Sequence, residues 1–207
     1  MPLTESPDVT RAPHTAVLAG PRLLGTLGMI ASPMLLLEGP LSQRFGAMGS
    51  NFWMGLCSLL YVLGWMCSLV GLRWLRATGD GLFARFFFWL QLVGLGLAAV
   101  WAAYYIVVPG LQEKTGLLQV TDAAWPLSHI LMLVLGGLLV GAKRLRGWRR
   151  FPPFLCGLAL PVFIVMRGVG APGAVMSLSF PVLTTLGFFL LGLAVRTSAD
   201  STPGAAP

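Results

Sequence analysis

Six long apolar runs, separated by short polar and charged connections, dominate the pattern along the chain. Within the runs the side chains are hydrophobic on consecutive positions, as in Phe86–Trp89 and Ile130–Val140. A membrane-spanning helix needs roughly 20 mostly apolar residues, whereas a membrane barrel strand alternates with a period of two. The pattern therefore predicts six transmembrane helices, at Arg22–Leu37, Phe52–Leu72, Phe83–Val108, Trp125–Gly141, Phe154–Met166 and Val175–Val195.

The first and fifth runs are the shortest, and each contains a proline. The first extends back through Ala16–Gly20 and the fifth from Phe151 to Gly170, which gives both a spanning length. Pro33 and Pro161 each remove a helix hydrogen bond, as does Pro181 in the sixth run. We expect bends at these three prolines.

The chain is predicted to form one all-α domain, a transmembrane bundle of six helices over residues 16–198. Residues 1–15 and 199–207 are rich in Pro, Ser, Thr and Ala and are predicted to be disordered cytoplasmic tails. The connections between the runs are too short to separate two domains.

Positive charge falls mainly on one side of this predicted bundle. Of the 14 Lys and Arg residues, only Arg44, Lys114 and Arg167 belong to the side opposite the two chain ends. The others lie near the chain ends and in the connections around residues 73–85 and 142–151. Cytoplasmic connections carry an excess of Lys and Arg. Both termini are therefore predicted to be cytoplasmic (N-in and C-in), with the chain in the inner (plasma) membrane.

Composition supports a membrane protein and narrows its partners. Charged residues make up 10% of the 207-residue chain and hydrophobic residues 56%, whereas soluble domains carry about 25% charged residues. The chain therefore lacks the charge to cover a water-facing surface. The net charge of +7 is expected to attract anionic lipids at the cytoplasmic face of the bilayer. No nucleic-acid partner is predicted, because no soluble module is present to bind one.

The candidate ligand site is a polar cluster near the outer ends of the predicted helices. His129 is placed about 6–9 Å into the membrane, at ~1.5 Å per residue from the start of the fourth run, and ionisable groups at depth usually face the bundle interior. The other members are Glu38, Trp101, Tyr104, Tyr105 and Arg167, at the outer ends of the first, third and fifth runs. We hypothesise that these residues converge on an outward-facing, ligand-binding pocket. The alternative is that Glu38 and Arg167 reach the interface separately while His129 bonds to nearby backbone.

Small residues at a spacing of four mark two predicted helix faces. They are Gly94, Ala98 and Ala102 in the third run and Gly137 and Gly141 in the fourth. Small residues at this spacing let helix backbones approach closely. Both faces are therefore predicted to pack within the bundle, and the alternative is that they dock a partner protein.

Gln91 is the one carboxamide well inside a predicted span. Amide side chains in membranes hydrogen-bond across helices, with contributions on the order of 1 kcal/mol. We expect a bond from Gln91 to Ser58 or Ser68 that holds the bundle together rather than one that contacts a substrate.

No catalytic, metal or cofactor site is predicted. Lys114 and Lys143 lie in connections, so no span supplies a Schiff-base lysine, and only one of the two histidines lies in a span. The cysteines Cys57, Cys67 and Cys156 form no CxxC pair. The sequence also contains no P-loop, HExxH or GxSxG motif.

The chain resembles a group of uncharacterised bacterial six-span inner-membrane proteins at three stretches. These are Trp65–Ser68, Trp125–Ser128 and Ala142–Trp148. The resemblance covers the second to fifth runs and implies a bacterial inner-membrane protein. It brings no activity, cofactor or site residue with it.

Three classes of function remain open. The first is binding or moving a small apolar or amphipathic molecule through the outer pocket. The second is an accessory or scaffold subunit that docks a membrane protein partner or a second copy of the chain. The third is an intramembrane enzyme that uses Glu38, His129 and Arg167. The scarcity of buried ionisable groups argues against the enzyme, and the bends together with the polar cluster favour binding or transport.

Overall fold

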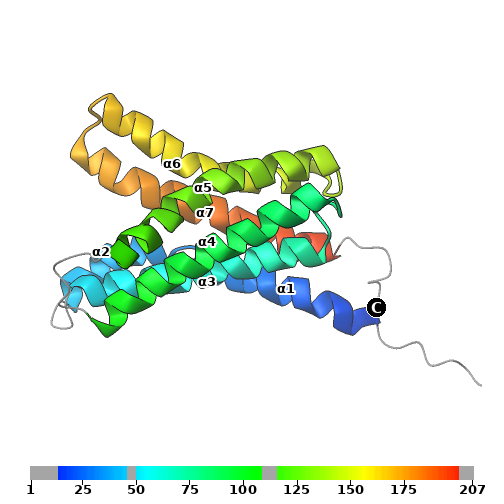
Figure 1. Ribbon diagram of the computed structural model, residues 1–207, viewed down its shortest axis with the longest axis horizontal. Coiled ribbons are helices and arrows are strands. Elements are labelled where there is room, and N and C mark those ends of the chain that lie inside the picture. The colour runs from blue at the N-terminus through cyan, green and yellow to red at the C-terminus, as the bar shows by residue number, and fades with distance from the viewer. Residues whose placement is uncertain (1–13, 46–49, 109–115, 201–207) are drawn as a thin grey trace, which may run out of the picture.

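The computed structural model describes residues 14–45, 50–108 and 116–200, which form helices joined by short turns (Figure 1). The helices are α1 (His14–Ala31), α2 (Met34–Arg44), α3 (Ser50–Trp74), α4 (Leu82–Val107), α5 (Gly116–Ala142), the 3₁₀ turn η2 (Gly147–Arg150), α6 (Pro152–Gly168) and α7 (Gly173–Asp200). No strand occurs within the described ranges. The all-α prediction is therefore confirmed.

Several of these helices are long and apolar enough to cross a membrane. Within the described ranges they are Phe52–Trp74, Leu82–Val107, Leu118–Ala142 and Val175–Ala199. Helices α1 and α2, bent by 41° at their junction, form a fifth candidate span as a pair. Helix α6 is apolar but has 17 residues, about 26 Å at 1.5 Å per residue. The structure thus contains four to five candidate membrane-spanning helices.

The first apolar run is divided at Pro33, where a bend was predicted. Pro33 has no N–H to donate to the carbonyl of Met29, and the hydroxyl of Ser32 donates to that carbonyl instead, at 2.9 Å. The hydroxyl of Thr185, in α7, donates to the carbonyl of Ser32 at 3.1 Å. The bend is therefore satisfied locally and tied to α7.

The other two prolines do not break their helices. Pro161 lies inside α6 and Pro181 inside α7, and both helices continue through them. Beyond Pro181, the hydroxyl of Thr184 donates to the carbonyls of Phe180 and Pro181, at 2.8 and 3.0 Å. Side-chain hydroxyls of this kind commonly satisfy backbone groups near prolines in membrane helices.

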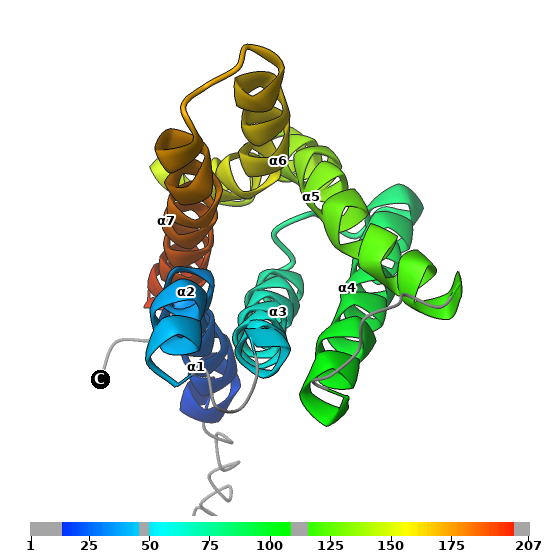
Figure 2. The ribbon, with the colours of Figure 1, turned by 90° about the vertical axis from the view of Figure 1, so that its left-hand side faces the viewer.

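The helices pack side by side in a closed order. Helices α3 to α7 each contact the next helix along the chain, and α7 returns to α1, which also packs on α3 (Figure 2). Helix α3 is the most buried of the single-helix candidate spans. Within its apolar 18-residue stretch 61% is buried inside the bundle, against 28% for α4. Its Tyr61, Trp65 and Leu69 are the centre of the hydrophobic core.

Both ends of the described chain lie at one end of the bundle. The start of α1, the end of α7, and the turns from α3 to α4 and from α5 to α6 are all found there (Figure 1). We call it the basic end, because its turns contain Arg76, Lys143, Arg144 and Arg146. The bent helix α2 and the start of α3 lie at the opposite end.

Helices α1 and α7 meet at two glycines. A Cβ atom added to Gly192 would lie 2.6 Å from the carbonyl oxygen of Gly25, and one added to Gly25 would lie 2.6 Å from the carbonyl oxygen of Gly192. Backbone atoms cannot move aside as flexible side chains do. This contact, which closes the bundle, therefore admits only glycine on either helix.

One of the two predicted small-residue faces packs within the bundle and the other does not. Ala98 and Ala102 are buried, and a Cβ on Gly94 would meet Ser128 of α5 at 2.9 Å. Gly137 and Gly141, by contrast, have open space around them. The prediction was therefore wrong for the second face, because α5 turns its neighbouring glycine, Gly136, toward Phe154 of α6.

Three predicted boundaries shift. Helix α5 begins at Gly116, well before the predicted start at Trp125, because the residues between them continue the helix. Helix α1 begins at His14, inside the predicted N-terminal tail, and α7 continues to Asp200, inside the predicted C-terminal tail. The remaining tail residues lie outside the described ranges.

Gln91 is fully buried, but its amide has no hydrogen-bond partner among the described residues. The predicted bond to Ser58 or Ser68 is therefore not formed.

Because a buried unsatisfied amide costs stability, we expect Gln91→Leu to raise the free energy of unfolding by about 1–3 kcal/mol. Unfolding in detergent with increasing SDS measures this change. Gln119→Leu, at an exposed position of α5, is the control, and a destabilised Gln91→Leu variant would contradict the expectation.

Candidate functional site

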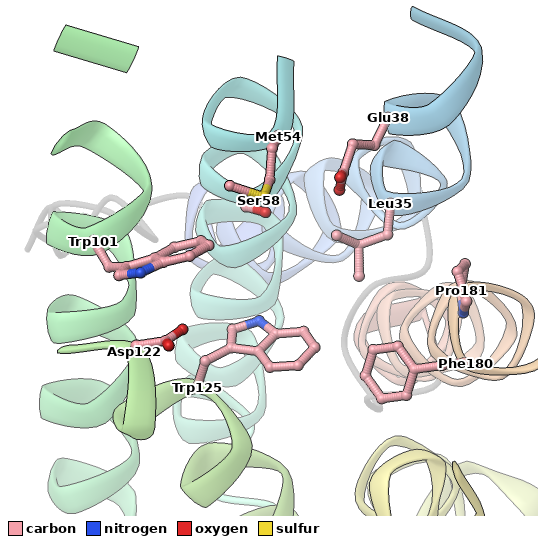
Figure 3. Close-up of a pocket in the computed structure, with 9 residues that line it drawn as sticks. All are labelled: Leu35, Glu38, Met54, Ser58, Trp101, Asp122, Trp125, Phe180 and Pro181. Atoms are coloured by element: carbon pink, nitrogen blue, oxygen red, sulfur yellow. The ribbon is translucent and has the colours of Figure 1, made fainter. Parts of the chain in front are cut away.

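A pocket of about 270 Å³ opens between five helices at the end of the bundle opposite the basic end. Figure 3 shows the residues that line it. They are Leu35 and Glu38 of α2, Met54 and Ser58 of α3, Trp101 of α4, Asp122 and Trp125 of α5, and Phe180 and Pro181 of α7. We call this the acidic pocket.

The bend at Pro33 supplies one wall of the acidic pocket. It turns α2 away from the axis of α1, and Leu35 and Glu38 follow in the next turns of that helix. The bond from Thr185 to the carbonyl of Ser32 holds the bend against α7. Pro181, on the same helix as Thr185, lines the pocket beside them (Figure 3).

Two carboxylates enter the acidic pocket from different helices. Glu38 extends from α2 and Asp122 from α5, and both side chains are half-buried (Figure 3). None of the described residues that line the pocket is basic. The pocket is therefore acidic, in a chain whose net charge is +7.

Three aromatic rings, those of Trp101, Trp125 and Phe180, form part of the remaining wall. Trp125 packs against Phe180 with ring centroids 5.2 Å apart, and Trp101 packs against Tyr105 at 4.7 Å. The indole Nε1 of Trp101 is buried and donates to no described residue. The pocket thus combines apolar ring faces with negative charge and one unused N–H donor.

His129 lies beneath this wall rather than in the pocket. Its side chain is 0% exposed, and Nδ1 lies 3.1 Å from the carbonyl oxygen of Trp125. Its ring contacts Trp125, Phe180 and Trp65, with centroids 4.6, 5.6 and 4.9 Å away. His129 therefore supports two rings of the pocket wall, and its bond to backbone follows the alternative interpretation of this residue.

Only two of the other predicted site residues lie together in the acidic pocket. Glu38 and Trp101 line the pocket. Tyr105 is buried behind Trp101, and Tyr104 is 37% exposed. Arg167 is exposed in the last turn of α6 and does not line the pocket. At this end of the bundle α6 diverges from α2, α3 and α4 (Figure 1), which keeps Arg167 away from Glu38.

The sequence-based prediction missed Asp122. The predicted fourth span begins at Trp125, which places Asp122 in the connection before it. Residues three apart share a face of a helix, so a helix that continued back past Trp125 would have placed Asp122 beside it. The spacing of Asp122 and Trp125 gives this signal only when the helix is known to begin before Asp122, as it does at Gly116.

The described residues show no metal site. They contain no group of three or more His, Cys, Asp or Glu side chains that could hold an ion. The three residues of the enzyme alternative, Glu38, His129 and Arg167, do not share the acidic pocket. What the pocket offers chemically is a small chamber with aromatic faces and two carboxylates.

Comparison with known proteins adds no family to this picture. No family model matches the chain, and the searches of curated proteins and of solved structures gave no match. The function is therefore argued from the acidic pocket.

Proposed function

We propose that the chain is a bacterial inner-membrane protein with six spans and cytoplasmic termini, and that it binds or moves a small amphipathic cation through the acidic pocket. Glu38 and Asp122, set among tryptophan and phenylalanine rings with no basic side chain among the described lining residues, carry this proposal. The ligand combines an apolar body with a positively charged group.

The six-span topology is supported by charge and by helix direction. The described chain ends and the Arg-rich turns share the basic end (Figure 1), as the excess of basic residues on cytoplasmic connections requires. On this proposal the bent pair α1 and α2 forms one span and the short helix α6 another. The acidic pocket then opens on the outer side.

The chemistry of the walls favours a cation. Tryptophan faces attract cations through the ring quadrupole, by about 0.5–2 kcal/mol according to the degree of desolvation. A half-buried carboxylate has also lost part of its hydration, and the attraction to a cation beside it compensates for that loss. A volume of about 270 Å³ is near the lower limit of ordinary ligand pockets, so the ligand is small.

A direct test compares two probes of the same shape that differ in charge. Benzyltrimethylammonium carries a permanent positive charge, and neopentylbenzene is its neutral carbon isostere. We expect the purified protein in mild detergent to bind the cation at least about tenfold more tightly, which corresponds to about 1.4 kcal/mol. Isothermal titration calorimetry, with tryptophan fluorescence as a second signal, measures both affinities.

Variants assign that preference to the two carboxylates. Glu38→Gln combined with Asp122→Asn is expected to abolish the preference for the cation, because the two carboxylates that attract it are gone. Asp80→Asn, a carboxylate at the basic end, is the matched control and is expected to keep the preference. Equal binding of both probes to the unaltered protein would refute a cation site.

The accessory-subunit alternative has one specific observation in its favour. Gly137 and Gly141 of α5 present a small-residue face that packs against nothing in the described chain, as in helices that dock a partner in the membrane. The same titration separates the two functions, because a subunit without a ligand shows no charge preference between the probes.

A further inference from the structure

We propose that a second pocket, at the basic end, binds the phosphate headgroup of an anionic phospholipid. This pocket has a volume of about 360 Å³ and is lined by Val70, Arg73, Trp74, Arg76, Asp80 and Arg85. We call it the arginine pocket. It shares no lining residue with the acidic pocket, so the inference is independent of the proposed function.

The side chain of Arg73 and the backbone of Arg76 are held in place before any ligand arrives. Nη1 of Arg73 donates to the carbonyl of Gly79 at 3.1 Å, and the guanidinium carbon lies 5.9 Å from the ring centroid of Phe88. Arg76 sits in the turn between α3 and α4 with φ at +50°, and its N–H donates to the carbonyl of Arg73 at 2.9 Å. Ala77, the next residue, is 0% exposed and anchors this turn. Such preorganisation lowers the entropy lost on binding.

The net charge of the arginine pocket is positive although the pocket contains a carboxylate. Asp80 pairs with Arg144, which lies outside the pocket lining, at 3.7 Å. Its charge is thus partly offset by a fourth arginine, which leaves Arg73, Arg76 and Arg85 to face an anion. Arginine forks match the geometry of phosphate oxygens better than a lysine point charge does.

The N-terminus of α4 lies beside these arginines. Gly81 precedes the helix and provides no side-chain cap, and Arg85 lies in the first turn. The positive end of the helix dipole and a basic side chain therefore occur together, which is unfavourable without an anion. Asp80 and Arg85, which flank the start of α4, both line the arginine pocket, so a phosphate bound by the guanidinium groups would lie near the positive end of this helix.

The surroundings identify the source of the phosphate as a lipid. Trp74 is 59% exposed and Val70 39% exposed, and both line the same pocket as the arginines. Leu82 and Phe83, at the start of α4, are also largely exposed. Apolar and aromatic side chains beside basic ones are typical of the level where headgroups meet acyl chains. A soluble phosphate would need the arginines but not this apolar border.

Competition between two lipids tests the proposal. The protein in detergent is mixed with equal amounts of phosphatidylglycerol and phosphatidylcholine, and the bound lipids are quantified by native mass spectrometry. We expect phosphatidylglycerol to be preferred. Arg73→Gln, Arg76→Gln and Arg85→Gln together are expected to reduce that preference at least about tenfold, since direct charge-assisted hydrogen bonds from guanidinium groups to the phosphate are lost.

The control removes the same charge from the connection between α5 and α6. Lys143→Gln, Arg146→Gln and Arg149→Gln together are expected to change the preference by less than about threefold, because diffuse charge outside the pocket is screened. Arg85→Gln alone, at an exposed position, serves if the triple pocket variant does not fold, and is expected to lower the preference about threefold or more. If the unaltered protein binds benzyltrimethylammonium at the acidic pocket, retained binding of this cation shows that a variant is folded. If the unaltered protein does not bind it, size-exclusion chromatography reports whether the variant is folded.

Two outcomes would overturn the proposal. Equal losses in the pocket and control triples would show a general charge effect rather than a site. Displacement of phosphatidylglycerol by millimolar inorganic phosphate, with no effect of matched sodium chloride, would show a site for soluble phosphate instead of a lipid.

Discussion

Gly192→Leu is expected to lower the free energy of unfolding by about 3 kcal/mol, because overpacking against a backbone that cannot move is costly. The first side-chain atom alone would lie 2.6 Å from the carbonyl oxygen of Gly25 and 2.8 Å from the backbone nitrogen of Met29. Relief requires α1 and α7 to separate, which opens the contact that closes the bundle. Thermal unfolding in detergent, followed by circular dichroism and size-exclusion chromatography, measures the loss.

Gly96→Leu is the matched control for this variant. Gly96 also lies within a helix, but a Cβ added there meets nothing within 4 Å. Leucine has a higher helix propensity than glycine, so this variant is expected to be as stable as the unaltered protein or slightly more stable. A Gly192→Leu protein as stable as Gly96→Leu would show that α1 and α7 do not meet in this way.

Trp65→Ala is the second change with a large expected effect, about 3–5 kcal/mol of lost stability. Trp65 is 1% exposed, and its indole N–H donates to the sulfur of Met132 at 3.4 Å. Its ring also contacts Phe188 and His129, with centroids 4.4 and 4.9 Å away. The cavity left by alanine would therefore loosen α3 from both α5 and α7.

A truncation on the outside of the bundle provides the comparison for Trp65→Ala. Trp89 of α4 is 63% exposed, and Trp89→Ala is expected to change the unfolding free energy by less than about 1 kcal/mol. SDS-induced unfolding of the two variants, monitored by circular dichroism, gives the difference directly. Similar losses in both would mean that Trp65 does not lie in the core.

The helices could be predicted from the sequence because each apolar run leaves its backbone no other way to satisfy its hydrogen bonds in lipid. The division at Pro33 was also predictable, since proline lacks the donor that the helix needs. The start of α5 was not. Residues 116–124 include polar side chains, and polarity alone does not distinguish a connection from a helix that lines a pocket.

The candidate site could be predicted only in part, because depth along a helix does not fix direction around it. Glu38 and Trp101 line the acidic pocket, as their depth and residue types suggested. Arg167 has the expected position along its helix but the wrong neighbours, since α6 diverges from the rest of the bundle at that end (Figure 1). His129 is buried by the packing of four aromatic neighbours, which no spacing in its own helix reveals.

Helix α3 lies along the bundle, and a separate pocket is found near each of its ends. Ser58 lines the acidic pocket and Val70 the arginine pocket, about 18 Å apart at 1.5 Å per residue. Trp65 packs in the core between the two pockets, and this packing opposes a shift of α3 along its own axis. If the two proposals hold, we therefore expect a ligand in one pocket to leave the affinity of the other unchanged, so that lipid at one end of the bundle does not affect binding at the other end.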